Sequence, residues 1–178
     1  MKPLLYLDVD GPLNPYAAPL FDRPLDGFTV IEVPHEPEPL RVWLDPRHGA
    51  ELLRLEYDLC WGTTWMAGAN EWIAPVVGLP RLPYVDFSAV LFQERPDGVH
   101  WKTQVLVEHA AGRPFAWVDD ELGPADEAFV AAHHPGAALL HYVSPLKGLR
   151  EEDFAALAAF ADSLPGPAVQ PPEGPGGR

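Results

Sequence analysis

The sequence predicts an α/β protein with a doubly wound, mostly parallel, Rossmann-like sheet and helices on both faces. A short apolar run without polar alternation at 4–7 indicates a strand buried on both faces, and further short strands are expected at 58–61 and 115–118. Helical segments between these runs give the alternation of strand and helix that is typical of this class. Ligands bind at the carboxyl ends of the strands in such sheets, so the residues that follow each run are the first candidates for a site.

Length and composition predict one domain followed by a tail. The chain has 178 residues, of which 47% are hydrophobic and 22 are prolines. A chain of this length can bury a sizeable core. We expect a catalytic domain over 1–164 and a disordered Pro/Gly-rich tail over 165–178, because the tail lacks residues that could form a core.

Charge and cysteine content exclude several classes of protein. Net charge is −14, from 12 Lys+Arg against 26 Asp+Glu, which disfavours an extended contact with nucleic acid. Cys60 is the only cysteine, which excludes an intramolecular disulfide and a zinc site built from cysteines. No apolar run approaches the ~20 residues that span a bilayer. We therefore expect a cytoplasmic protein that does not enter a membrane.

The first third of the chain predicts a strand, an insertion and a helix. The strand covers 4–7, and the insertion over 12–45 is expected to form a β-hairpin flap from two strands at 28–33 and 40–44. The proline-rich residues between these two strands predict a stiff hairpin tip. Asp45 and Pro46 predict the start of a helix, with Asp45 as N-cap and Pro46 at the first helical position.

The rest of the chain continues the alternation. Strands are expected at 58–61, 85–87, 115–118 and 137–143, and helices at 67–73, from about 99 to 111, and at 151–164. His133 and His134 are expected in a surface loop before Pro135 rather than in a metal site, because no zinc-binding spacing is present. Tryptophan side chains are expected in the core and in cleft walls, at 61, 65, 72, 101 and 117.

The segment Asp8-Val9-Asp10-Gly11 carries the clearest chemical signal. Residues two apart in an extended segment point the same way, so both carboxylates could face one site, and Gly11 allows a sharp turn after them. Together with Asp119 or Asp120 they could bind a hard cation through oxygen ligands. The alternative is a turn in which the aspartates only cap backbone amides. The spacing does not fit an EF-hand calcium loop.

The motif LLYLDVDGPLN, at 4–14, resembles the first motif of the haloacid dehalogenase-like (HAD-like) superfamily. That superfamily also uses a Ser/Thr after the second strand, a Lys near a later helix start and an acidic pair after a fourth strand. Thr63, Lys102 and the pair Asp119-Asp120 stand here in that order. The resemblance covers roughly 4–143. Within the superfamily, the sequence is also similar to a branch with a WxTxW-like second motif, for which a role in RNA end repair has been proposed.

The resemblance implies a Mg²⁺-dependent phosphatase. Asp8 would be the nucleophile that forms an aspartyl-phosphate, and Asp10 the acid that protonates the leaving group and then activates water. Thr63 would donate a hydrogen bond to the phosphoryl oxygens, and Lys102 would neutralise charge beside Asp8. Mg²⁺ would be bound by Asp8, Asp10 through its backbone carbonyl, and Asp119.

Several alternatives remain open at the level of sequence. Thr64 could take the place of Thr63, and Asp120 that of Asp119, because strand ends predicted from sequence are good to ~2–4 residues. Asn14 and Thr64 are candidates for contact with a small phosphorylated substrate. Rival functions are a catalytically silent module that binds Mg²⁺ or a phosphorylated ligand, an RNA-end-processing phosphatase, and a receiver-like phosphoacceptor domain. Asp10 counts against the last of these.

Overall fold

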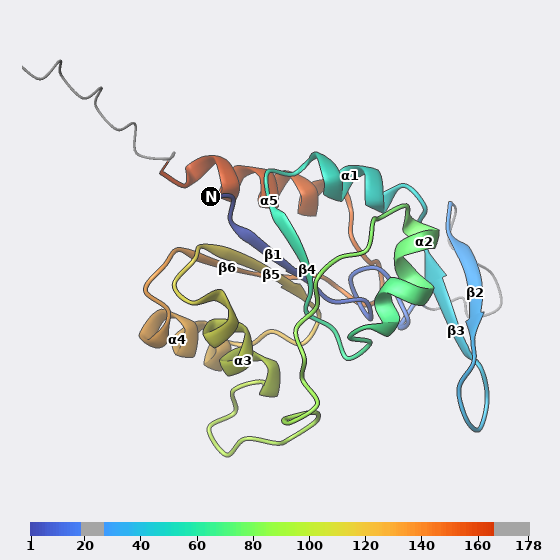
Figure 1. Ribbon diagram of the computed structural model, residues 1–178, viewed down its shortest axis with the longest axis horizontal. Helices are drawn as coiled ribbons and strands as arrows, with labels where there is room; N and C mark the ends of the chain where they lie inside the picture. The colour runs from blue at the N-terminus through green and yellow to red at the C-terminus, as the bar shows by residue number, and fades with distance from the viewer. Residues whose placement is uncertain (19–26, 166–178) are drawn as a thin grey trace, which may run out of the picture.

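The protein is described by a computed structural model, shown in Figure 1, over residues 1–18 and 27–165. Part of the predicted insertion, at 19–26, lies outside the described residues. The predicted disordered tail does so too from residue 166 onward. Within the described ranges, no helix combines the length and the apolar character needed to cross a membrane.

A parallel sheet of four strands forms the centre of the molecule, in the order β4-β1-β5-β6. These strands are β1 (Leu4–Leu7), β4 (Asp58–Trp61), β5 (Phe115–Asp119) and β6 (Ala138–Tyr142). Every residue of β1 and β5 is buried, which explains their unbroken apolar sequences. Because all four strands are parallel, their carboxyl ends meet at one edge of the sheet.

Helices cover both faces of this sheet (Figure 1). Leu5 and Leu7 of β1 belong to one core cluster, whereas Leu4 and Tyr6 belong to the other, as the two-residue period of a strand requires. The first cluster packs under α1 (His48–Arg54), η1 (Ala69–Ile73, a π-helical segment), α2 (Ala74–Val77) and α5 (Glu151–Ser163). The second cluster packs under α3 (Trp101–Ala110) and α4 (Pro124–His133).

The predicted hairpin is confirmed and forms a separate two-stranded sheet. Strands β2 (Thr29–Val33) and β3 (Leu40–Leu44) pair antiparallel, and the tip between them, at 34–39, is exposed. The carboxyl-terminal half of β3 is buried, and Val42 and Leu44 join the first core cluster. The hairpin is therefore anchored to the domain through β3, with its tip in solvent.

Three local predictions were wrong. Helix α1 begins at His48, because the Asp45 carboxylate accepts the backbone N–H of Arg47 (2.9 Å) and so caps the chain before the first helical turn. No strand forms over 85–87; a single bridge joins Tyr84 to Trp61 instead. His133 is the last residue of α4 and His134 is buried, so these histidines do not lie in a surface loop.

Helix α4 was missed although its start signal is in the sequence. Pro124 occupies the first turn, and the Asp126 carboxylate accepts the backbone N–H of Gly123 at 3.0 Å. The same carboxylate accepts the backbone N–H of His100 at 2.8 Å, which joins the start of α4 to the start of α3. Asp126 thus fixes the two helices that cover the second face of the sheet.

Candidate active site

The structure brings the predicted acidic residues and Lys102 together at the carboxyl edge of the sheet. Asp8 follows β1, Thr63 follows β4, and Asp119 is the last residue of β5. Lys102 comes from the first turn of α3, whose N-cap His100 accepts the backbone N–H of Lys102 at 3.2 Å. Residues far apart in the sequence therefore meet at the place that the parallel topology predicts.

Lys102 binds two carboxylates at once. Its Nζ lies 2.6 Å from Oδ2 of Asp8 and 2.8 Å from Oδ2 of Asp119. The lysine side chain is only 2% exposed. Burial alone would lower the pKa of Lys102, but the two carboxylates outweigh burial and raise it, so the amine stays charged. Trp117 donates its indole N–H to the same oxygen of Asp119 at 3.1 Å.

Asp8 is placed in an environment that disfavours its charge. Burial raises the pKa of Asp8 and the neighbouring Asp119 adds to this effect, whereas Lys102 and a hydrogen bond from Thr63 lower the pKa, with a net value of about 8. The other oxygen of Asp8 accepts the backbone N–H of Val9 at 2.7 Å. A second cation beside this carboxylate would therefore favour its ionised form.

Asp10 is oriented by two side chains that lie on different segments. Asn14 donates from Nδ2 to Oδ1 of Asp10, and Trp65 donates from Nε1 to Oδ2, each at 2.8 Å. The Asn14 oxygen accepts the backbone N–H of Trp43 in β3 at 3.0 Å. Gly11 has φ +87° and donates its N–H to the carbonyl of Asn14 at 2.9 Å, which closes the loop. The Asp10 carboxylate is thus fixed relative to both the loop and the hairpin.

Three carboxylates form a cluster that suits a hard cation. Asp8, Asp119 and Asp120 offer oxygens that all lie within 4.8 Å of one another. Carboxylate oxygens are the ligands that Mg²⁺ and Ca²⁺ prefer, so the donor set fits such an ion. Both members of the acidic pair belong to this cluster, but their surroundings differ. Asp119 is fully buried and binds Lys102, whereas Asp120 accepts a hydrogen bond from the Tyr16 hydroxyl at 2.8 Å. The Asp10 carboxylate is not a member, and ligation through its carbonyl stays a prediction.

An open cavity of about 270 Å³ adjoins this cluster. It is lined by Asp8, Asp10, Tyr16, Thr64, Phe92, Trp101, Lys102, Asp120 and Glu121. Thr64 lines the cavity, whereas Thr63 is fully buried and lies behind it as a partner of Asp8. Asn14 is buried, and both its amide nitrogen and its amide oxygen form hydrogen bonds within the protein. Contact between Asn14 and a substrate therefore stays a prediction.

Tryptophan side chains lie both in the core and in the wall of this site, as the sequence predicted, but the hydrogen bond from Trp65 to Asp10 was not expected. Trp61 and Trp117 are fully buried, as expected of core residues. Trp65, however, binds a proposed catalytic carboxylate, and Trp101 lines the cavity beside Lys102. The available signal was positional, because Trp65 follows Thr63 by two residues and Trp101 directly precedes Lys102.

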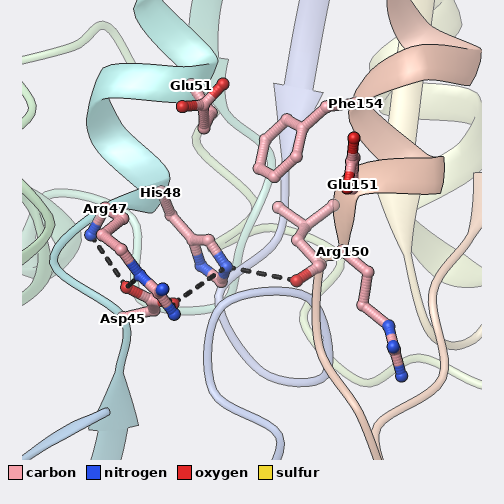
Figure 2. Close-up of a pocket in the computed structure, with 8 residues that line it drawn as sticks. Asp45, Arg47, His48, Glu51, Arg150, Glu151 and Phe154 are labelled. Carbon is pink, nitrogen blue, oxygen red and sulfur yellow. Dashed lines mark hydrogen bonds and ion pairs between the residues drawn. The ribbon is translucent and has the colours of Figure 1, made fainter. Parts of the chain in front are cut away.

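A second cavity, of about 420 Å³, lies between the starts of α1 and α5 (Figure 2). His48 forms part of its wall, with Nε2 3.1 Å from the carbonyl oxygen of Leu149 and 3.9 Å from Oδ2 of Asp45. Burial lowers the pKa of His48 despite the nearby Asp45 carboxylate. This cavity shares no lining residue with the one beside Asp8.

Comparison with known proteins returned no match among family models, curated proteins or solved structures.

Proposed function

We propose that this chain is a cytoplasmic, Mg²⁺-dependent phosphohydrolase of the HAD-like type, with a Rossmann-like fold, that acts on a small phosphorylated substrate through an aspartyl-phosphate on Asp8. The observation that carries the proposal is the arrangement around Lys102, whose amine bridges Asp8 and Asp119 at the carboxyl edge of a parallel sheet. A buried cation between two carboxylates, next to a third one and an open cavity, is suited to a dianionic phosphoryl group and a divalent ion.

In the first step, a carboxylate oxygen of Asp8 forms a bond to phosphorus as the bond from phosphorus to the ester oxygen breaks. The departing oxygen takes the proton of the Asp10 carboxyl group. Asn14 and Trp65 fix the two oxygens of Asp10, which supports a proton donor with one orientation toward the cavity.

In the second step, Asp10 as a carboxylate takes a proton from water, and the water oxygen attacks phosphorus. The bond between phosphorus and Asp8 breaks, which releases inorganic phosphate and restores both aspartates to their starting forms. Lys102, whose Nζ lies 2.6 Å from Asp8, supplies positive charge beside that carboxylate.

Mg²⁺ would be bound by Asp8, Asp119 and Asp120, and it would supply positive charge to the phosphoryl oxygens. It would also offset the burial and the repulsion from Asp119 that together raise the pKa of Asp8. The cation and Lys102 together would account for the crowding of acidic groups at this edge of the sheet.

The test is hydrolysis of an aryl phosphate by wild type and by Asp8→Asn, with Mg²⁺ and with excess chelator. We expect activity that requires the ion and is lost in the variant. Asp162→Asn, at an exposed carboxylate on α5, is the matched control and should retain full activity. Wild-type activity that persists in Asp8→Asn would exclude the aspartyl-phosphate.

A silent module that binds Mg²⁺ or a phosphorylated ligand is the second candidate. It is favoured by the engagement of both Asp8 oxygens, one by Lys102 and one by the Val9 N–H. Saturable Mg²⁺ and phosphate binding without turnover of any member of a phosphoester panel would support it. An RNA end is the less favoured substrate, because Lys102 is the one cation among the described residues that line the cavity.

A further inference from the structure

Three aromatic side chains line the cavity beside Asp8: Tyr16, Phe92 and Trp101. Phe92 is 69% exposed and Tyr16 is 49% exposed, so neither is there to fill the core. Large exposed aromatic surface beside a polar cavity is a feature of binding sites rather than of ordinary protein surface.

Phe92 is in a backbone conformation that bulky residues avoid. Its φ is +56°, in the left-handed region. An exposed phenylalanine in this region gains little from burial that would offset the strain, and such outliers cluster at functional sites. The strained conformation nevertheless places the Phe92 ring at the cavity, in edge contact with Trp101 at 5.7 Å and 64°.

The Trp101 ring is held in place by packing and lies next to the Lys102 amine. Its ring packs edge-on against the fully buried Phe87 at 5.3 Å and 87°. The Nζ of Lys102 lies 5.6 Å from the centroid of the Trp101 ring. A planar group one or two bonds from the ester oxygen of a phosphoryl group at Lys102 would therefore lie beside the Trp101 ring, which Phe92 contacts edge-on, and stacked or edge contacts are favourable there.

The charges around the cavity restrict the rest of the substrate. Lys102 is already paired with Asp8 and Asp119, while Asp10, Asp120 and Glu121 also line the cavity. A bound divalent ion and Lys102 can accommodate one phosphoryl group. A second anionic group farther from phosphorus would face Glu121 and Asp120 without a cation among the described lining residues.

From these contacts we infer the substrate class. It is a phosphomonoester whose alcohol carries a planar, uncharged aromatic ring one or two bonds from the ester oxygen. Phe92 and Trp101 are the residues that select the ring. The inference rests on the proposed function, because it takes the phosphoryl group to bind at Asp8 and Lys102. It adds that diphosphates, and phosphate esters with a second anionic group, are poor ligands of this site.

The experiment measures binding, so that it does not depend on turnover. Calorimetry at saturating Mg²⁺ compares benzylphosphonate with cyclohexylmethylphosphonate, which has similar bulk but no aromatic ring, and with 4-carboxybenzylphosphonate. Wild type should bind benzylphosphonate on the order of fivefold more tightly than the cyclohexyl compound, as expected for one aromatic pair. The carboxylated compound should bind most weakly.

The variant Phe92→Gly removes the ring and accepts a positive φ, so it should fold at least as well as wild type. We expect it to lower the affinity ratio of the first two phosphonates toward one, because the ring contact with Phe92 is lost while Trp101 remains. Tyr142→Leu, at an exposed aromatic residue of β6 outside the cavity, should leave the ratio unchanged. A ratio near one in wild type, or an unchanged ratio in Phe92→Gly, would overturn the inference, as would absence of phosphonate binding.

The outcomes separate this inference from the proposed function. If aryl phosphate hydrolysis depends on Asp8 but the aromatic phosphonate binds no more tightly, the proposed phosphatase activity is supported and the aromatic-ring site is overturned. If the aromatic phosphonate binds more tightly but no phosphate ester is hydrolysed, the aromatic-ring site is supported and the protein is a binding module rather than a phosphatase.

Discussion

The indole nitrogen of Trp65 donates a hydrogen bond to Oδ2 of Asp10 at 2.8 Å, across 55 residues of sequence. Trp65 follows β4 and Asp10 follows β1, two neighbouring strands of the sheet. The contact orients the carboxyl group to which we assign proton transfer. A tryptophan that would otherwise count as packing therefore has a positioning role in the proposed chemistry.

We expect Trp65→Phe to lower kcat by roughly ten- to a hundredfold with little change in KM, because a misoriented acid loses part of its contribution. Trp72→Phe, at a partly buried tryptophan of η1 that packs on the first core cluster, is the control for loss of an indole. Equal effects of the two variants would assign Trp65 to packing alone.

Gly11 lies too close to Asp120 to accept a side chain. A Cβ at Gly11 would lie 2.4 Å from Cγ of Asp120, and its φ is +87°. We expect Gly11→Ala to lower the free energy of unfolding by more than the ~1–2 kcal/mol of left-handed strain and to weaken Mg²⁺ binding by displacing Asp120. Gly98→Ala is the matched control, because Gly98 has φ +73° but nothing within 4 Å of its Cβ position. Chemical denaturation and Mg²⁺ titration of both variants provide the comparison.

Lys102 stabilises the fold as well as the site. Its removal in Lys102→Met leaves the buried Asp119 carboxylate without its cation and Asp8 without its hydrogen-bond donor, so we expect a loss of about 3–5 kcal/mol without metal. Mg²⁺ should restore more stability to the variant than to wild type, because the ion replaces the missing charge. Lys2→Met, which removes a half-exposed lysine paired with Glu56, should have little effect. A variant as stable as wild type in chelator would contradict the buried ion pair.

Cation affinity should depend on pH through Asp8. Burial raises the pKa of Asp8 to about 8 in the metal-free protein, so the group is mostly protonated at pH 7 and must lose its proton to bind a cation. Affinity should therefore rise by up to roughly tenfold per pH unit between about pH 6 and 8, and level off above that. Calorimetry in two buffers of different ionisation enthalpy should detect proton release, and Asp8→Asn should abolish it.

Stability at acid pH should depend on His48. Burial lowers its pKa below the ~6.5 of an unfolded histidine, so the unfolded state binds a proton first as pH falls. The free energy of unfolding should therefore decline below about pH 6.5. His48→Gln, whose amide can still donate to the Leu149 carbonyl, should reduce this slope, and His35→Gln in the exposed hairpin tip should not. Urea denaturation of the three proteins at pH 7 and pH 5 provides the measurement.

The sheet was predictable from sequence because its signal is local. A strand buried on both faces needs a continuous apolar run, and such runs mark β1, β4 and β5 to within one residue. The parallel topology then requires that Asp8, Thr63 and Asp119 meet at one edge. The position of Lys102 also follows from sequence, since it lies in the first turn of a helix that starts near that edge.

The parts that sequence did not reveal depend on contacts between distant segments. Asn14 bonds the backbone of Trp43, and Tyr16 reaches Asp120 across 104 residues. No periodicity or spacing encodes such pairs, because they form only when loops from different strands are packed together. The missing strand at 85–87 has a similar cause: Asn70 binds the backbone of Leu82, and a single bridge at Tyr84 completes the contact with β4.

The bond between Asn14 and the Trp43 backbone has an evolutionary consequence. Because the base of the hairpin supports the residue that orients Asp10, we expect that loss or exchange of this insertion would disturb the proton transfer that we propose for Asp10. The exposed tip at 34–39 has no such constraint. In descendants of this chain, we expect insertions and deletions to accumulate at the tip, while Asn14 and the length of β3 are inherited together with the aspartates.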